Sequence, residues 1–450
     1  MGRGRRRRAP PYVMDTDLDP KGGNAVALCD ANAFYCSAER VMDPSLKGRP
    51  LAVASNNDGN LIARSAEAKA LGIRMGDPLH KPPASDIIKR HGVAIRSSNY
   101  TLYADMQQRI LAAMAASVGH QSIEVYSIDE AFACLNGFRH LDLERHCQDM
   151  RKRILEWTTI PTCVGIGPNK TLAKLANAVA KKNPLFDGVA DLRDEQVRRY
   201  VMDRFEVADV WGVGSATARK LAGLGVETAA QLRDMPLRQA RGLGTVVLER
   251  LVAELRGVVA HPMEYVAPER KGMACTGSFG QPVTEFETLM GAIAEHAMRA
   301  GEKLREHGMM AGRMIVFFHT NPHREDLPQA SVSRTGTMQP ITNDPFVMID
   351  LARRLAKRGY REGYAYTKAG IVLENLAAEG ERPLTLFEDP DVLAKRRRLI
   401  GAIDEVNAKF GRLTIVPASQ GFERVWKRRA DFKSPRWTTR IEELPVARAG

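Results

Sequence analysis

The chain has 450 residues, of which 44% are hydrophobic and 26% charged, a balance typical of a soluble protein with two to four domains. Its 66 Lys and Arg against 53 Asp and Glu give a net charge of +13, which favours a polyanion such as nucleic acid over a small neutral substrate. No stretch approaches the roughly 18 apolar residues of a membrane helix, and no apolar signal region follows the N-terminal arginines, which argues against membrane-spanning and secreted classes.

The six cysteines show no Cys-x-x-Cys pair and no zinc-ligand spacing, and some of them lie inside apolar runs. We therefore expect free, buried thiols in a reducing compartment. Together with the basic charge, this predicts a cytoplasmic, nucleoid-associated protein. Residues 1–24, which carry an arginine cluster, are predicted to form a disordered basic extension.

A short apolar run over residues 25–29 ends abruptly at Asp30, and a helix-compatible segment carrying Tyr35 follows it. The run has the length of a buried strand, which would place Asp30 at the end of that strand. The same residues are also compatible with Asp30 as the cap of a helix that begins near Ala31.

A second apolar run over residues 51–54 leads into a polar turn over residues 55–60. We predict a helix over residues 63–71, which ends at Gly72, and another over residues 100–116. From spacing alone, Arg64 and Lys69 would be ordinary solvated cations on the first of these helices.

Two adjacent acids, Asp129 and Glu130, interrupt a strand-like apolar run over residues 125–134. A regular strand would drive one of them into the core, whereas a tight hairpin or bulge would let both emerge on one side of a sheet edge. If this strand pairs with the strand that ends at Asp30, three carboxylates converge.

Such a convergence has a chemical consequence, because two like charges about 4 Å apart repel by roughly 4 kcal/mol at an effective dielectric near 20. The cluster must therefore hold protons or metal. Oxygen ligands without His or Cys nearby favour Mg²⁺ and the two-metal chemistry of phosphoryl or nucleotidyl transfer. The alternative is a helix cap at Asp30 and a solvated turn at Asp129 and Glu130, and these residues alone support both interpretations equally.

A strand over residues 162–166 is followed by a Gly-Pro-Asn turn and a helix that runs to about Lys181. At helical spacing Lys170, Lys174 and Lys181 share one stripe, with apolar residues opposite. A lysine stripe is usually a solvated face. Because this one begins at a helix N-terminus after a glycine turn, contact with a triphosphate or a DNA backbone is modestly favoured.

A new unit is predicted to begin near Pro184. Gly212 and Gly214 precede a helix over residues 215–224, which has the form of a helix–hairpin–helix whose backbone amides could approach a phosphate. An ordinary turn between helices is the alternative. A weaker second copy of this pattern lies at Gly242 and Gly244.

From about residue 265 the pattern changes to strands and helices in alternation. Strands are predicted over residues 276–279, 314–319, 331–338 and 367–373, and helices over residues 286–307 and 345–358. These elements make a compact α+β module.

Beyond residue 375 the pattern loosens. Residues 383–387 form a short apolar peptide suited to docking in a partner's groove, although local packing is as well supported. Residues 423–440 interleave basic side chains with Trp426, Phe432 and Trp437, which suits contact with nucleic acid or protein.

Taken together, these stretches resemble the Y-family translesion DNA polymerases, and within that family the UmuC branch, over roughly residues 25–447. The diagnostic stretches are residues 29–35, 55–59, 66–72, 98–100, 126–132, 169–176 and 434–440. The resemblance implies an α+β multidomain fold in the form of a right hand. Its expected parts are the palm (25–34 and 98–182), the fingers (35–97), a helical thumb with a helix–hairpin–helix (183–260), the little finger (265–377) and a UmuC-type tail (378–450).

The resemblance also implies roles for individual residues. Asp30, Asp129 and Glu130 would be catalytic and, assisted by the backbone carbonyl of Ala31, would hold two Mg²⁺ ions. Tyr35 matches the steric gate that excludes a 2′-hydroxyl, and Lys69 and Lys181 match positions that contact the triphosphate. Ala63 and Ala66 stand where many relatives carry Thr and Tyr for that contact, so Arg64 is a candidate substitute. DNA contacts are expected at Lys170, Lys174, Gly212 and Gly214.

The implied activity is template-directed, error-prone DNA synthesis past lesions in the SOS response, with dNTPs and primer-template DNA as substrates. Implied partners are a homodimer of processed UmuD, the RecA filament and the sliding clamp. The clamp peptide would use Leu384, Leu386 and Phe387, with Pro383 in place of the usual Gln. Two alternatives are a polymerase IV-like enzyme (DinB) that acts without UmuD and a catalytically silent DNA-binding accessory protein.

Overall fold

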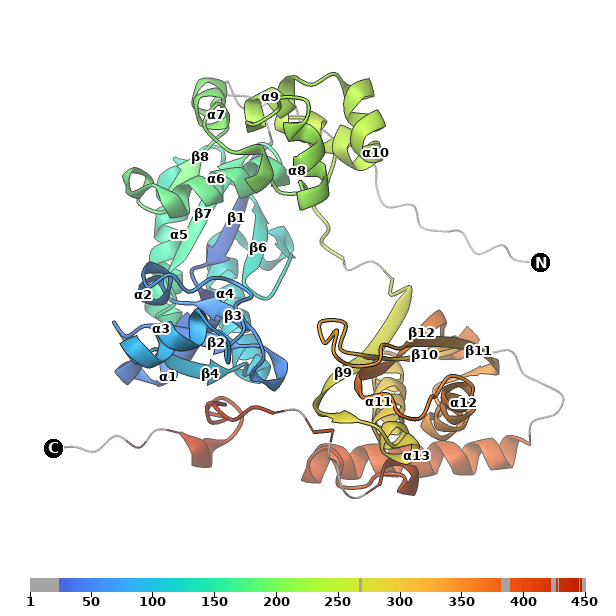
Figure 1. The fold of residues 1–450 in the computed structure, drawn as a ribbon. Coiled ribbons are helices and arrows are strands. Elements are labelled where there is room, and N and C mark those ends of the chain that lie inside the picture. The colour runs from blue at the N-terminus through green and yellow to red at the C-terminus, as the bar shows by residue number, and fades with distance from the viewer. Residues whose placement is uncertain are drawn as a thin grey trace.

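The structure is a computed structural model that describes residues 24–266, 269–381, 389–421, 426–427, 429–444 and 446. A five-stranded sheet in the order β5-β6-β1-β7-β8 forms the centre of the N-terminal half (Figure 1). Its strands are β1 (Val26–Ala31), β5 (Ile123–Val125), β6 (Glu130–Cys134), β7 (Thr162–Gly167) and β8 (Val189–Asp191). This sheet lies in the predicted palm, but β8 extends it beyond residue 183, so the predicted start of the thumb comes too early.

Helices cover both faces of this sheet: α4 (Tyr100–Val118) and α5 (Leu143–Thr158) pack on one face, and α6 (Lys170–Lys182) packs on the other. Along β1, Ala27 and Cys29 pack in the core shared with α4 and α5, whereas Val26 and Leu28 pack with Ala173 of α6. Because successive strand residues point to opposite faces, Asp30 lies on the face that α6 covers.

Two glycines of β7 allow α6 to lie directly on the sheet. A Cβ at Gly165 would lie 2.0 Å from the backbone nitrogen of Asn177 and 2.2 Å from the carbonyl oxygen of Ala173. A Cβ at Gly167 would lie 2.6 Å from the backbone nitrogen of Ala173. The absence of side chains at these two positions therefore brings the lysines of α6 within reach of the strand that carries Asp30.

A smaller three-stranded sheet, in the order β3-β2-β4, lies in the predicted fingers. The elements of this region are α1 (Phe34–Met42), β2 (Leu51–Ala54), β3 (Leu61–Arg64), α2 (Ala66–Ala70), α3 (Ala84–His91) and β4 (Ala94–Ser97). The helix predicted over residues 63–71 is therefore wrong at its start. Arg64 belongs to β3, because residues 61–64 pair with β2 and tertiary pairing overrides local helix propensity.

The next unit is helical and shares a core with α6. It contains α7 (Glu195–Met202), α8 (Ser215–Ala222), α9 (Ala229–Asp234) and α10 (Leu237–Leu255). The predicted helix–hairpin–helix is present in shortened form, since a single 3₁₀ turn at Val207–Asp209 takes the place of its first helix. At the predicted weaker copy, Gly244 lies in a break inside α10.

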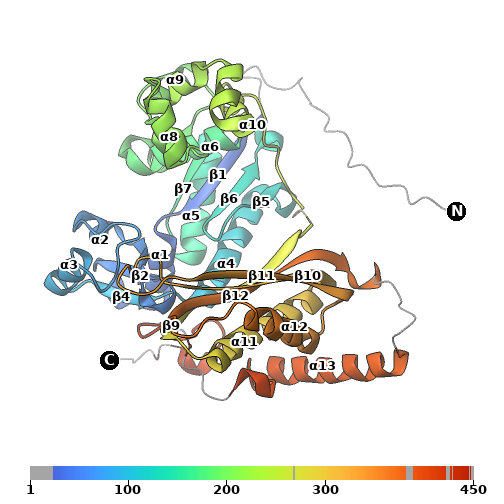
Figure 2. The same ribbon diagram turned by 45° about the vertical axis from the view of Figure 1, so that its right-hand side comes forward.

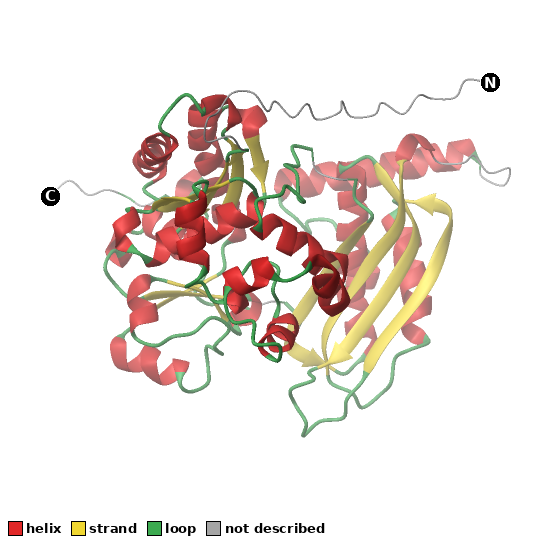
Figure 3. Ribbon diagram, turned by 90° about the horizontal axis from the view of Figure 1, so that it is seen from above, coloured by secondary structure: helices red, strands yellow, loops and turns green. Residues whose placement is uncertain are grey.

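A four-stranded antiparallel sheet in the order β11-β10-β12-β9 forms the next unit, with both of its helices on one face (Figures 2 and 3). Its elements are β9 (Gly272–Val283), α11 (Phe286–Glu306), β10 (Met309–Thr320), β11 (Ser331–Thr342), α12 (Pro345–Lys357) and β12 (Tyr366–Ala378). All six elements were predicted in this order, because their alternating and helical periodicities are strong.

The C-terminal region is more ordered than its sequence pattern predicts. A long helix, α13 (Pro390–Phe410), runs across the ends of α11 and α12 (Figure 1), and its Asp404 accepts two hydrogen bonds from Arg305 at 2.7 and 2.8 Å. Beyond it, Trp426 is buried, and its indole nitrogen donates to Glu295 of α11 at 3.2 Å. Trp426 and Trp437 are thus buried against the chain itself, so neither is available for the contact with nucleic acid or another protein that the sequence suggested.

No helix in the described part of the chain is long and apolar enough to cross a membrane.

Candidate active site

The acids predicted to converge lie at the paired ends of two central strands. Asp30 of β1 is the direct antiparallel partner of Glu130 of β6, so the two side chains lie on the same face of the sheet. The backbone nitrogen of Ala31 donates to the carbonyl oxygen of Asp129 at 2.9 Å. Residues 126–129 form the tight turn of the β5–β6 hairpin, and the nitrogen of Ser127 donates to the carbonyl oxygen of Glu130 at 3.0 Å. The hairpin interpretation is correct, and Asp30 is not a helix cap.

Two lysines of α6 pair with these acids. The ammonium nitrogen of Lys181 lies 2.5 Å from Asp30 Oδ2, and that of Lys174 lies 2.8 Å from Glu130 Oε2. Lys174 also lies over the rings of Tyr126 and Trp211, at 4.4 and 5.3 Å from their centroids. Since Trp211 lies in the helical unit that contains α7 to α10, this cation–π contact joins that unit to the acid site.

Burial has the largest effect on the pKa of Asp30, whose exposed fraction is 6%. It raises the pKa of Asp30 to about 7, the ammonium of Lys181 pulls the pKa down, and the neighbouring carboxyl of Glu130 raises it further. The pair of acids is therefore electrostatically strained, and additional positive charge at this site would relieve the strain.

The third acid is held differently. Asp129 Oδ1 accepts a hydrogen bond from Ser127 Oγ at 2.6 Å, and Ser127 Oγ also accepts from the backbone nitrogen of Glu130 at 3.1 Å. Within the described ranges, no group of three His, Cys, Asp or Glu side chains is close enough together to hold a metal ion. The donor chemistry still fits a hard divalent cation, because the buried carboxylate of Asp30 meets the partly buried carboxylate of Glu130, and Asp129 is the next residue in sequence.

Lys170, which was expected to contact DNA, lies elsewhere. It is 5% exposed, and its ammonium nitrogen lies 2.5 Å from Glu124 Oε2. The same carboxylate also accepts a hydrogen bond from the backbone nitrogen of Glu264, which lies 2.7 Å from Glu124 Oε2. The stripe is not the solvated face that such patterns usually form, because it packs against the acid-bearing side of the sheet. Lys170 is a buried structural partner and not a surface cation.

Tyr35 lies on α1, directly after the turn that follows β1. Ala33 adopts a left-handed conformation there, with φ at 46°, and this turns the chain sharply from the strand into the helix. The ring of Tyr35 stacks on Tyr103 of α4, with centroids 4.3 Å apart and planes 16° apart. Burial raises the pKa of the Tyr35 hydroxyl, and the nearby Tyr100 and Asp129 raise it further. Tyr35 thus lies close to the turn that carries Asp129.

The two other cations predicted at the nucleotide site differ in their surroundings. Lys69 of α2 is exposed. Arg64 is half-buried, and its Nη1 donates to the carbonyl oxygen of Ile73 at 3.2 Å. Its Nε is buried without a hydrogen-bond partner among the described residues. An unpartnered buried donor is costly, so Arg64 retains the capacity to bind an anion.

The glycines of the predicted phosphate-binding hairpin have backbone conformations suited to a tight turn. Gly212 has φ at 96°, a region that favours glycine, and Gly214 is the N-terminal cap of α8. The predicted clamp-binding residues Leu384, Leu386 and Phe387 lie outside the described residues.

Sequence reasoning missed the groups that support these site residues. Among them are Ser127, which holds Asp129, and the pair Tyr126 and Trp211, which encloses Lys174. Ser127 carried a usable signal, because a Ser two residues before an Asp in a turn can form such a hydrogen bond. The aromatic pair carried none, since 85 residues of chain separate its members.

Family models match most of the chain. The model described as the impB/mucB/samB family matches residues 29–178, and the model of that family's C-terminal domain matches residues 270–386. A domain of unknown function, DUF4113, matches residues 397–447.

Curated relatives and solved structures agree with these matches. The chain is 40% identical to Protein UmuC of Salmonella typhimurium, over 93% of this chain and 99% of the relative. It is 35% identical to Protein ImpB of the same species, over 94% and 100%, and 27% identical to DNA polymerase IV of Moorella thermoacetica, over 87% and 94%.

Among solved structures, a Y-family DNA polymerase chimera superposes with a TM-score of 0.62 at 22% identity, over 79% of this chain and 99% of that chain. At this identity the superposition supports the fold alone, and it agrees with the sheet of paired acids and the four-stranded module described above. The chain therefore belongs to the UmuC-like branch of the Y-family DNA polymerases, the DNA-directed DNA polymerases of error-prone translesion synthesis in the SOS response.

Proposed function

We propose that Asp30, Asp129 and Glu130, with the backbone carbonyl of Ala31, hold two Mg²⁺ ions that serve the transfer of a nucleotide to a primer 3′-hydroxyl. The observation that carries this proposal is the direct cross-strand pairing of Asp30 with Glu130, each with a lysine counter-charge. When bound, the ions supply a lowered pKa for the attacking hydroxyl and charge stabilisation for the departing pyrophosphate.

The lysines of α6 complement this site. Lys181 and Lys174 form ion pairs with Asp30 and Glu130. Divalent cations at the acids would take over this neutralisation, and Lys181, whose side chain is 35% exposed, would be able to turn to the triphosphate. Lys174 is held by Tyr126 and Trp211, so it stays close to the site, where it can meet the DNA backbone.

The incoming deoxynucleotide is bound from the side of the fingers. Tyr35 packs against its sugar and leaves no space for a 2′-hydroxyl. Lys69 and the unpartnered Nε of Arg64 contact its phosphates, in place of the groups that Ala63 and Ala66 lack. The thumb hairpin at Gly212 and Gly214 binds the backbone of the primer-template through amide N–H groups, independently of base sequence.

The partners of the complex follow from the relative named UmuC, with which this chain is collinear over nearly its whole length. They are a dimer of processed UmuD, the RecA filament and the sliding clamp, which would be contacted through Leu384, Leu386 and Phe387. Recruitment to DNA would make the protein nucleoid-associated.

Primer extension on undamaged and lesion-containing templates tests the proposed function. Purified protein with Mg²⁺ and dNTPs, with and without processed UmuD and RecA filaments, should extend primers past the lesion. If extension is equally efficient without UmuD and RecA, the enzyme acts as the polymerase IV-like alternative does. Binding of primer-template without extension under any of these conditions would establish the accessory-protein alternative.

The elevated pKa of Asp30 predicts how metal affinity depends on pH. Mg²⁺ binds the deprotonated carboxylate, and burial raises the pKa of Asp30 to about 7. The Mg²⁺ concentration at half-maximal extension should therefore be constant above pH 8 and rise by up to about tenfold per pH unit below 7. Titrations at about pH 6 and about pH 8, with the concentration of Mg²⁺-bound dNTP held equal, measure this. Equal half-maximal concentrations at both values would contradict the prediction.

A further inference from the structure

The tail that follows α13 crosses from the four-stranded module to the fingers and palm. The backbone nitrogen of Arg429 donates to Asn57 Oδ1 at 3.0 Å, and that of Asp431 donates to Asp58 Oδ2 at 2.8 Å. At the end of β4, Ser97 and Phe432 exchange two hydrogen bonds, at 3.0 and 3.1 Å. We call residues 429–437 the docked tail.

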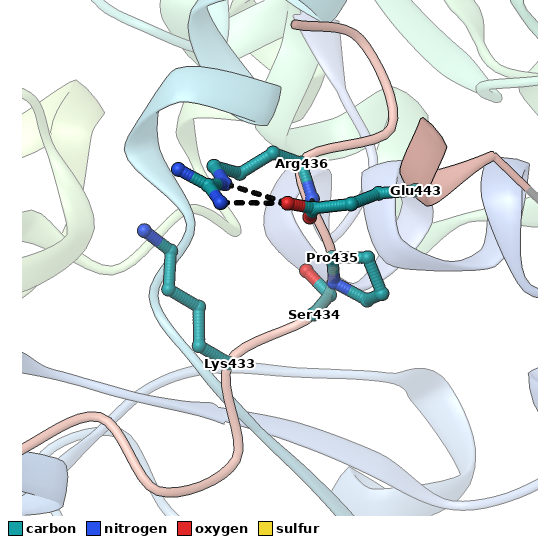
Figure 4. A pocket seen from close by; sticks show the side chains of 5 residues that line it. All are labelled: Lys433, Ser434, Pro435, Arg436 and Glu443. Carbon is teal, nitrogen blue, oxygen red and sulfur yellow. Dashed lines mark hydrogen bonds and ion pairs between the residues drawn. The ribbon is translucent and has the colours of Figure 1, made fainter. Parts of the chain in front are cut away.

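The docked tail ends in buried contacts. Trp437 is 9% exposed and belongs to the core formed by α1, α4 and α5. Figure 4 shows the outer side of this segment, where Arg436 pairs with Glu443 at 2.7 Å beside a surface hollow of about 580 Å³. The docking therefore buries specific side chains and is not a loose surface contact.

One docked-tail side chain binds a buried acid. Ser434 is 6% exposed, and its hydroxyl donates to Glu39 Oε1 at 3.1 Å while accepting from Asn99 Nδ2 at 2.9 Å. Glu39 is fully buried on α1, and the hydroxyl of Tyr103 donates to the same Oε1 at 2.8 Å. Glu39 Oε2 has no hydrogen-bond partner among the described residues. The carboxyl is therefore held in place by the hydroxyls of Ser434 and Tyr103, which both donate to Oε1.

The same tyrosine supports the nucleotide site. Tyr103 is fully buried, its hydroxyl is held by Glu39, and its ring face is stacked on Tyr35. Tyr100 packs edge-on against both rings, at 6.1 Å from each. A continuous series of contacts therefore runs from Ser434 through Glu39 and Tyr103 to the ring of Tyr35.

We propose that the docked tail positions the sugar-selecting ring. Ser434 holds Glu39, Glu39 fixes the ring of Tyr103, and Tyr103 holds Tyr35 where a 2′-hydroxyl would collide with it. This inference rests on the proposed role of Tyr35 as steric gate. Ser434 lies in the C-terminal region that the model of a domain of unknown function matches. The proposal therefore gives this region a function: it supports the polymerase site through a residue about 400 positions away from Glu39 in the sequence.

The test compares single incorporation of a dNTP and of the matching rNTP by the full-length chain and its variants. Ser434→Ala should lower the preference for dNTP by at least about fivefold, chiefly through faster rNTP incorporation, because a displaced ring leaves room for the 2′-hydroxyl. Tyr103→Phe keeps the stacked ring and removes only its hydroxyl, so it should shift the preference in the same direction. Thr439→Ala, at an exposed position two residues beyond the docked tail, is the matched control and should leave the preference unchanged.

Tyr35→Ala separates failure of this inference from failure of the proposed gate. If Tyr35→Ala leaves the dNTP preference unchanged, Tyr35 is not the gate. If Tyr35→Ala abolishes the preference but Ser434→Ala and Tyr103→Phe stay within about twofold of wild type, the tail does not position the ring. Equal losses of dNTP and rNTP incorporation in Ser434→Ala would likewise overturn the proposal, because they indicate a purely structural contact. Should Ser434→Ala fail to fold, Tyr103→Phe alone decides.

Discussion

Asp30→Asn should abolish DNA synthesis, lowering kcat/KM for nucleotide incorporation by roughly a thousandfold or more. The amide has almost the shape of the carboxylate but lacks the charge that a divalent cation requires. The fold should survive, because the substitution removes a charge whose burial is unfavourable. Lys181, which loses its partner, has a side chain that is 35% exposed and can be solvated. Circular dichroism and single-nucleotide incorporation measure the two effects.

The pH dependence of stability provides an independent check on the same variant. In the fold, burial raises the pKa of Asp30 to about 7 from an ordinary value of 3.8. The folded state therefore binds a proton more tightly than the unfolded state, so the metal-free wild type should lose stability as the pH rises from about 4 through 7. Asp30→Asn should lack this component.

Asp105→Asn is the matched control for Asp30→Asn. Asp105 lies on the outer face of α4 in a surface ion pair with Arg109, so its loss should change neither activity nor pH dependence measurably. Folded Asp30→Asn protein with near-normal incorporation would exclude Asp30 from the metal site.

Lys170→Met should lower the free energy of unfolding by about 3 kcal/mol or more, because it leaves the carboxylate of Glu124 buried without its cation. Both side chains are less than a tenth exposed, so water cannot replace the ammonium group. The nitrogen of Glu264 still donates to Glu124, which compensates only in part. Differential scanning calorimetry should show a thermal midpoint lower by several degrees.

The double variant Lys170→Met, Glu124→Gln serves as the control. An amide at position 124 can still accept from Glu264 without carrying an unpaired charge, so most of the lost stability should return. Salt-dependent DNA binding separates this structural role from the original expectation. If folded Lys170→Met protein keeps its stability but binds DNA more weakly with a smaller salt slope, Lys170 is a phosphate contact after all.

The predictable parts of the fold are those whose local pattern is strong. The short apolar runs over residues 25–29 and 125–134 indicated strands at Asp30 and Glu130, and the expectation that these residues meet is confirmed by the register of β1 and β6. The four-stranded module was equally predictable, because each of its elements has clear periodicity. Arg64 shows the limit of prediction from local pattern, because its sequence is compatible with a helix but it pairs with β2 as part of a strand.

The sequence by itself determined the candidate site residues: three acids at strand ends, a lysine stripe on one helix and a tyrosine after the first strand. Only the tertiary structure decided what faces them, because a periodic pattern identifies a polar face but not the element that covers it. The periodicity places Lys170 on a polar stripe, whereas the structure buries it 2.5 Å from Glu124. The two tryptophans of the tail suit a binding surface by their spacing, whereas both are buried in the chain's own core. Contacts such as that of Ser434 with Glu39 join residues 395 positions apart, and no local rule of spacing or propensity extends over that distance.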